Sequence, residues 1–202
     1  MVSAGIKEME MKESKPKPEE KKNTEPSKPA EEKKDPDILT LEDLKQQVHL
    51  IEKSVQMKDS RFVARVLRAL PSTRKKLNNS VLIALINGYY TSTSNDKSKL
   101  LEYLGQSMDT DDAKPLAFHP RSAKASAQPL LPEVSAYISL LLLIYLIDAE
   151  SYDKAVLWAN QIAEKLAALN RRTLDGLQAK CYFYYARAHE LSGKLETIRR
   201  YY

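Results

Sequence analysis

VSAYISLLLLIYLI, residues 134–147, is the longest apolar run in this chain of 202 residues. It is shorter than the roughly 18–20 residues that an α-helix needs to cross a bilayer. A helix that is apolar on every side must instead be covered by protein on every side. The run therefore predicts a central buried helix, with other helices around it, in a protein without a membrane span.

Composition supports an all-α fold and an intracellular protein. Five glycines are too few for a glycine-rich phosphate-binding loop or a turn-dense β-barrel. The single cysteine, Cys181, excludes an internal disulfide and a multi-cysteine zinc site. Its apolar helical surroundings predict a buried structural thiol. Because the N-terminus lacks the apolar run of a secretory signal, we expect a soluble intracellular protein.

Three helices are expected after the central run. Residues 151–168 carry apolar side chains at helical spacing, and a second helix covers 172–191, with Gly193 placed to end it. A further helix begins at Lys194. The expected buried stripe of the first helix consists of Tyr152, Ala155, Trp158, Ile162 and Leu166.

Two of the expected turns between helices resemble each other, the one after the central run and the one after the helix at 172–191. Residues 149–155 (AESYDKA) and 192–198 (SGKLETI) lie at an offset of 43 residues, each at the junction of two helices. The pattern is similar to the tetratricopeptide helix–turn–helix, in which Ala155 would allow close helix approach and Tyr152 would fill the space between helices. Because the usual period is 34, we expect an irregular α-solenoid, a fold that serves as a scaffold.

Four shorter amphipathic helices are expected before the central run. The first begins near Ile38 with Thr40 as its N-cap. The second covers Ser60–Leu70 and stops at Pro71, and the third runs from residue 72 or 73 to about Tyr90. The apolar positions expected to face the core are Leu41, Leu44, Val48, Ile51, Val55, Phe62, Val63, Val66, Leu67, Leu70, Leu77, Val81, Leu85, Tyr89, Leu100, Leu101 and Leu104.

Charge and aromatic content separate a tail from the helical part. Residues 1–37 hold nine Lys against eight Glu and two Asp, a net charge of −1, so the remainder of this +5 chain carries +6. All fifteen aromatic residues follow the tail. Such a segment cannot bury enough apolar surface to offset the entropy of ordering, so we predict disorder. The predicted organisation is a tail (1–37), a helical block (38–104), a flexible loop (105–129) and tetratricopeptide-like helices (130–202).

No residues are placed for catalysis or for binding a metal or cofactor. His49, His119 and His189 are far apart in the sequence, and there is neither an HExxH motif nor a Cys/His cluster. There is also no GxSxG motif, and Cys181 has no recognisable histidine partner. We therefore expect a protein without enzymatic activity and without a cofactor.

A run of cations in the second helix is the candidate binding surface. Arg61, Arg65 and Arg68 fall on the side opposite Phe62 and Val66, and more cations follow Pro71. This ridge is compatible with a solvated helix face or with an electrostatic docking surface for an acidic protein. Nucleic acid is not the expected partner, because no aromatic stacking platform accompanies the charges. The six cations are Arg61, Arg65, Arg68, Arg74, Lys75 and Lys76.

Several long segments carry a resemblance to a known family. Residues 39–79 (LTLEDLKQQVHLIEKSVQMKDSRFVARVLRALPSTRKKLNN) resemble the N-terminal region of the 26S proteasome non-ATPase regulatory subunit 3 family, components of the lid of the 19S regulatory particle. The resemblance covers about residues 38–200. The further segments that carry it are Met108–Thr110, Leu130–Val134, Asn170–Arg172 and Ala179–Arg187.

The resemblance implies a non-catalytic scaffold that acts in cytoplasm and nucleus. Members of the family look like tetratricopeptide-type arrays leading into a PCI domain, and they hold neighbouring lid subunits, including a small, acidic, disordered one. The PCI domain is absent from this sequence, so we expect a fragment, an incomplete gene model or a truncated form. The alternative function is a free-standing tetratricopeptide-like adaptor that binds a protein or peptide outside the proteasome.

Overall fold

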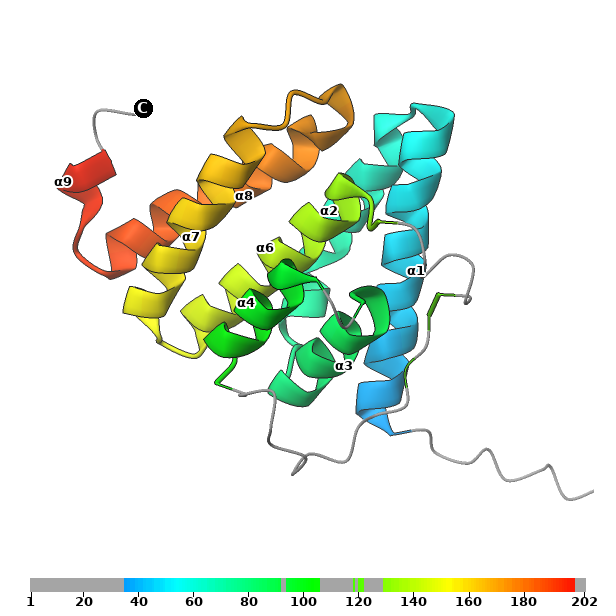
Figure 1. Ribbon diagram of the computed structural model, residues 1–202, viewed down its shortest axis with the longest axis horizontal. Coiled ribbons are helices and arrows are strands. Elements are labelled where there is room, and N and C mark those ends of the chain that lie inside the picture. Colours follow the sequence, from blue (N-terminus) through cyan, green and yellow to red (C-terminus); the bar gives the residue numbers. More distant parts are fainter. Residues whose placement is uncertain (1–34, 92–93, 106–117, 119, 122–128, 199–202) are drawn as a thin grey trace, which may run out of the picture. The chain divides into compact units, whose positions relative to one another are not determined.

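The structure is a computed structural model that describes residues 35–91, 94–105, 118, 120–121 and 129–198. In this part of the chain every regular element is a helix, which confirms the expected all-α class (Figure 1). Most of the predicted tail and of the predicted 105–129 loop lie outside the described residues. The helices are α1 (Pro36–Met57), α2 (Ser60–Arg74), α3 (Asn79–Tyr89), α4 (Asn95–Tyr103), α6 (Pro132–Asp148), α7 (Tyr152–Ala167), a 3-10 turn (Arg172–Leu174), α8 (Asp175–Leu191) and α9 (Leu195–Ile198).

The helix α6 is the centre of the fold, as the sequence predicted. Fourteen of its seventeen residues are buried, on all of its sides. The helices α1 and α2 pack against it from the N-terminal part of the chain, and α7 and α8 pack against it from the C-terminal part. One continuous apolar core therefore runs through the described helices, with α6 common to both halves.

The first helix begins earlier than predicted. Its N-cap is Asp35, and Pro36 occupies the first turn, where the fixed φ of proline suits a helix start. The prediction of Thr40 as the N-cap is therefore wrong. Thr40 lies inside the helix, and its hydroxyl donates to the carbonyl of Pro36 at 2.8 Å. The last two residues predicted in the tail, Pro36 and Asp37, belong to α1.

The second helix continues through Pro71, where we expected it to stop. Proline lacks an N–H and disfavours a helix interior, but α2 extends to Arg74. The extra turn places Thr73 in the core, where its hydroxyl accepts a hydrogen bond from Nε2 of Gln47 in α1 at 2.9 Å. This tertiary contact stabilises the extra turn and so opposes part of the local cost of the proline. Because residues 72–74 belong to α2, the third helix begins only at Asn79.

A polar node joins three helices beneath that turn. The hydroxyl of Tyr137, a fully buried residue of α6, donates to Oε1 of Gln47, whose Nε2 donates to Thr73. Buried polar groups of this kind are stable only when they are hydrogen-bonded. The node therefore fixes α1, α2 and α6 in one relative rotation.

A buried carboxylate holds the connection between α7 and α8. Glu133, in the first turn of α6, is 0% exposed. Nη1 of Arg171 lies 3.2 Å from both of its carboxylate oxygens, and the hydroxyl of Thr173 donates to Oε1 at 2.5 Å. Both partners belong to the segment between α7 and α8, so Glu133 anchors that segment to the central helix.

Removing the cationic partner of Glu133 should weaken the fold. We expect Arg171→Met to lower the free energy of unfolding by about 3 kcal/mol, because a buried charge is left with one hydroxyl partner. The neighbouring Arg172 is exposed, so Arg172→Met is the matched control and should stay within about 0.5 kcal/mol. Urea denaturation followed by circular dichroism measures both variants. Equal stability of the two would contradict the anchoring role of Glu133.

Candidate functional site

Four of the six predicted ridge cations share one side of α2. At about 100° per residue, Arg61, Arg65, Arg68 and Lys75 fall within about 80° of one another, over about 21 Å of helix. All four are exposed, whereas Val63 and Leu70 of the same helix are buried. We call these four residues the basic stripe.

The other two predicted cations are held by acidic residues of the protein. Arg74 donates to both carboxylate oxygens of Asp148 at the end of α6, with Nε 2.7 Å from Oδ2. This hydrogen bonding raises the pKa of Arg74. Nζ of Lys76 lies 3.0 Å from Oδ2 of Asp43 in α1. Arg74 and Lys76 therefore connect helices, and the structure separates them from the basic stripe.

The basic stripe is largely available to an anionic surface. Arg61 is 91% exposed, with Nε 3.3 Å from a carboxylate oxygen of Asp59. Within the described residues, Arg65, Arg68 and Lys75 make no ion pair. Exposed pairs of this kind contribute little to stability and are screened by salt. The stripe can attract an acidic partner at little cost in desolvation.

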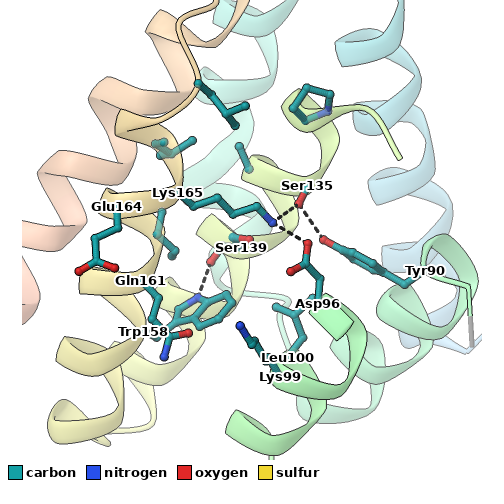
Figure 2. A pocket seen from close by; sticks show the side chains of 15 residues that line it. Tyr90, Asp96, Lys99, Leu100, Ser135, Ser139, Trp158, Gln161, Glu164 and Lys165 are labelled. Atoms are coloured by element: carbon teal, nitrogen blue, oxygen red, sulfur yellow. Dashed lines mark hydrogen bonds and ion pairs between the residues drawn. The ribbon is translucent and has the colours of Figure 1, made fainter. Parts of the chain in front are cut away.

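A second feature, a hollow of about 420 Å³ between α4, α6 and α7, was not found by sequence reasoning (Figure 2). Its apolar lining includes Leu100, Trp158 and Ile162. Helical periodicity marked all three as core positions, and nothing in the sequence shows that the helices leave a space between them. Hollows of this size are large enough for a small ligand or for one side chain of a peptide.

The polar wall of this hollow is occupied by its own hydrogen bonds, drawn in Figure 2. Nζ of Lys165 in α7 lies 2.6 Å from Oδ2 of Asp96 in α4 and 3.3 Å from Oγ of Ser135. The hydroxyl of Tyr90 lies 3.1 Å from the same Oγ. Burial raises the pKa of Tyr90 to about 12. These contacts fasten α4 to α6 and α7.

The chemistry-bearing residues considered in the sequence are not brought together. Cys181 is buried, as predicted, and burial raises the pKa of its thiol to about 12. His189 is also buried, with Nε2 3.4 Å from Oδ1 of Asn160, whereas His49 lies on the exposed side of α1. His119 lies outside the described residues. In the described part of the chain no group of three or more His, Cys, Asp or Glu side chains could hold a metal ion.

Three of the predicted repeat-packing residues lie in α7, and Gly193 lies in the turn after α8. Ala155 is fully buried, as close helix approach requires. Nε1 of Trp158 donates to the carbonyl of Ser139 in α6 at 3.1 Å, and its ring lies 5.0 Å from that of Tyr103 in α4. Tyr152 is half-buried at the start of α7.

The two turns that resemble each other in sequence also have the same hydrogen bonds. Glu150 and Gly193, at equivalent positions, have positive φ values of +56° and +69°. In each turn the next residue closes the helix by donating to the carbonyl five residues back, the Schellman motif. The four hydrogen bonds are Ser151 to Leu146 (3.0 Å), Glu150 to Ile147 (3.2 Å), Lys194 to His189 (2.9 Å) and Gly193 to Glu190 (3.1 Å).

Helices joined by turns of one repeated geometry are typical of a tetratricopeptide-type fold. Comparison with known proteins gives the particular family. Residues 36–202 match the model described as PSMD3-like, N-terminal TPR repeats. The chain therefore belongs to the family of 26S proteasome non-ATPase regulatory subunit 3, which confirms the resemblance inferred from the sequence.

Relatives from distant organisms support this assignment. The probable 26S proteasome non-ATPase regulatory subunit 3 of Drosophila melanogaster is 40% identical over 172 residues, covering 85% of this chain and 34% of the relative. The Dictyostelium discoideum subunit is 36% identical over 176 residues, covering 85% and 35%. The probable subunit of Nicotiana tabacum is 35% identical over 162 residues, covering 78% and 32%. The chain thus spans about a third of the length of these curated relatives.

The length and apolarity of the described helices bear on whether any of them could cross a membrane. Across the described residues, no helix combines the length and the apolarity needed to cross a bilayer. The most apolar helix, α6, is instead covered by protein, as described above.

The positive φ values in the two turns predict that introducing a glycine and removing one have opposite effects on the free energy of unfolding. Glu150→Gly should raise the free energy of unfolding by about 0.5–1 kcal/mol, since a side chain at positive φ is strained. Gly193→Ala should lower it by about 1 kcal/mol for the same reason. No heavy atom lies within 4 Å of an added Cβ at Gly193, so the effect comes from the backbone. Urea midpoints at unchanged m-value measure both, and shifts of the same sign would contradict the shared turn geometry.

Proposed function

We propose that this chain is a non-catalytic structural subunit of the proteasome regulatory-particle lid. It would support ubiquitin-dependent protein degradation through protein–protein contacts, in cytoplasm and nucleus. The observation that carries this proposal is the family match over residues 36–202. The relatives named above carry the same subunit name, and a tetratricopeptide-type array is a fold whose exposed helix faces serve as binding surfaces.

Its partners in this proposal are other lid subunits. The basic stripe would dock an acidic one, such as a small, acidic, disordered subunit. Support comes from the charges of α2, where Arg65, Arg68 and Lys75 carry no intramolecular ion pair among the described residues. Solvated cations in a row accelerate the association of an oppositely charged chain and favour it over neutral competitors.

A free-standing adaptor is the second candidate function. The hollow between α4, α6 and α7 favours it, because an apolar lining with a polar rim can accept a side chain of a bound peptide. In this alternative the chain would bind its partner outside the proteasome. The hollow, and not the basic stripe, would be the binding surface.

Charge reversal tests the docking role of the basic stripe. We expect the triple variant Arg61→Glu, Arg65→Glu and Arg68→Glu to weaken capture of lid subunits by about tenfold or more at low salt, since several ion pairs are lost. The difference should shrink as salt screens the charges. Pull-down over a salt series measures this dependence.

The matched control carries the same change in charge elsewhere. Lys154, Arg172 and Lys194 are exposed, lie outside α2 and do not line the hollow, so replacing them with Glu should leave capture unchanged. An equal loss in both triple variants would mean that net charge alone matters. Full capture by the stripe variant would refute the docking role.

Native gels separate the scaffold from the adaptor. When the chain is expressed with a tag in cells, the scaffold proposal predicts that it co-migrates with lid subunits on a native gel. Migration as a free chain, or with partners that are not proteasome subunits, would refute the scaffold and favour the adaptor. Glycerol-gradient sedimentation of the same lysate provides an independent measurement of the same association.

A further inference from the structure

Ser72 lies within the basic stripe. At about 100° per residue, it faces the same side of α2 as Arg68, four residues before it, and Lys75, three residues after it. Arg65 is two turns earlier on that side. Three cations of the basic stripe therefore share one exposed side of the helix with Ser72.

The Ser72 hydroxyl is available for reaction. Ser72 is exposed, and among the described residues its hydroxyl makes no hydrogen bond. The adjacent hydroxyl, that of Thr73, is buried and occupied, because it donates to the carbonyl of Ala69 at 3.3 Å and accepts from Gln47. The two neighbours therefore differ sharply in accessibility, and only Ser72 can be reached from solvent.

The backbone at Ser72 lies in the last turn of α2, which lacks one of the usual helical hydrogen bonds. Pro71 has no N–H to donate to the carbonyl four residues earlier, and α2 ends at Arg74, three residues later. A helix end that lacks one of its hydrogen bonds frays more readily than a helix interior. Local opening that releases the contacts of Thr73 and Arg74 would let residues around Ser72 extend, which is the conformation that a protein-kinase substrate groove accepts.

We propose that Ser72 is a phosphorylation site for a basophilic protein kinase, and that its phosphate switches off the basic stripe. The regulatory part rests on the docking role proposed above. In the reaction Oγ of Ser72 forms a bond to the γ-phosphorus of ATP, and the bond to the β,γ-bridging oxygen breaks. ADP leaves with the electron pair, and the hydroxyl proton passes to the base of the kinase.

The cations near Ser72 explain both how a kinase would recognise this serine and how its phosphate would act on the basic stripe. Cations on both sides of a serine complement the acidic substrate groove of a basophilic kinase. Once attached, the phosphate brings a charge of about −1.5 to −2 into the stripe. Hydrogen bonds to Arg68 and Lys75 then occupy cations that would otherwise meet an acidic partner. The partial negative charge at the end of α2, about half a unit, opposes the phosphate but is smaller than the charge of these cations.

The proposal is tested on the full chain with ATP and purified protein kinase C. We expect mass spectrometry to locate one phosphate at Ser72, and Ser72→Ala to abolish it. The control Ser60→Ala, at the exposed first residue of the same helix, should leave labelling unchanged. Labelling at other residues only, or undiminished labelling of Ser72→Ala, would overturn the phosphorylation site.

The effect on docking is measured separately with a fluorescent poly-glutamate peptide. The phosphorylated chain should bind the peptide about tenfold more weakly than the unmodified chain, since two or three exposed ion pairs are lost. Ser72→Glu should weaken binding in part, and Ser72→Gln should not. If the unmodified chain fails to bind the peptide, the docking role fails while the mapped site stands. If it binds and the phosphate has no effect, the switch is refuted.

Discussion

The burial of α6 on every side is the constraint on which the rest of the fold depends. A helix with fourteen buried residues cannot lie at a surface, so both flanking groups of helices are required to cover it. This explains why the chain forms one continuous core although its hairpins resemble independent repeats. Two polar contacts of α6 join it to both parts of the chain, because Glu133 binds the segment between α7 and α8 and Tyr137 binds Gln47 in α1.

The sequence predicted the apolar faces better than the helix ends. The continuous apolar run located the buried helix α6. Helical spacing located four buried positions of α7, whereas the predicted Tyr152 is only half-buried. Local rules failed at Thr40 and Pro71. At Thr40 the deciding residue lies outside the capping motif, because Pro36 starts α1 earlier. At Pro71 the deciding contact is tertiary, because the core position of Thr73 allows α2 to continue past the proline. Gly193 was predicted correctly, because the left-handed turn it forms is purely local.

The basic stripe and the hollow were likewise predictable only where they depend on residues that are close in the sequence. Helical spacing could place Arg61, Arg65 and Arg68 on one side of α2, since that depends on the helix alone. It could not separate Arg74 and Lys76 from them, because their partners, Asp148 and Asp43, are distant in sequence. The hollow beside α4 was equally hidden, for it arises from the way three helices fail to fill the space between them.

The polar node of Gln47, Thr73 and Tyr137 has an evolutionary consequence. It holds α2 by the side that carries Thr73, whereas the basic stripe is exposed. Apart from Arg74, which meets solvent and also joins α2 to α6, the residues of α2 that contact the core differ from those that meet solvent, so selection can act on the two sets independently. The outward side of α2 can diverge between species and acquire new partner preferences, while the inward side keeps the same fold.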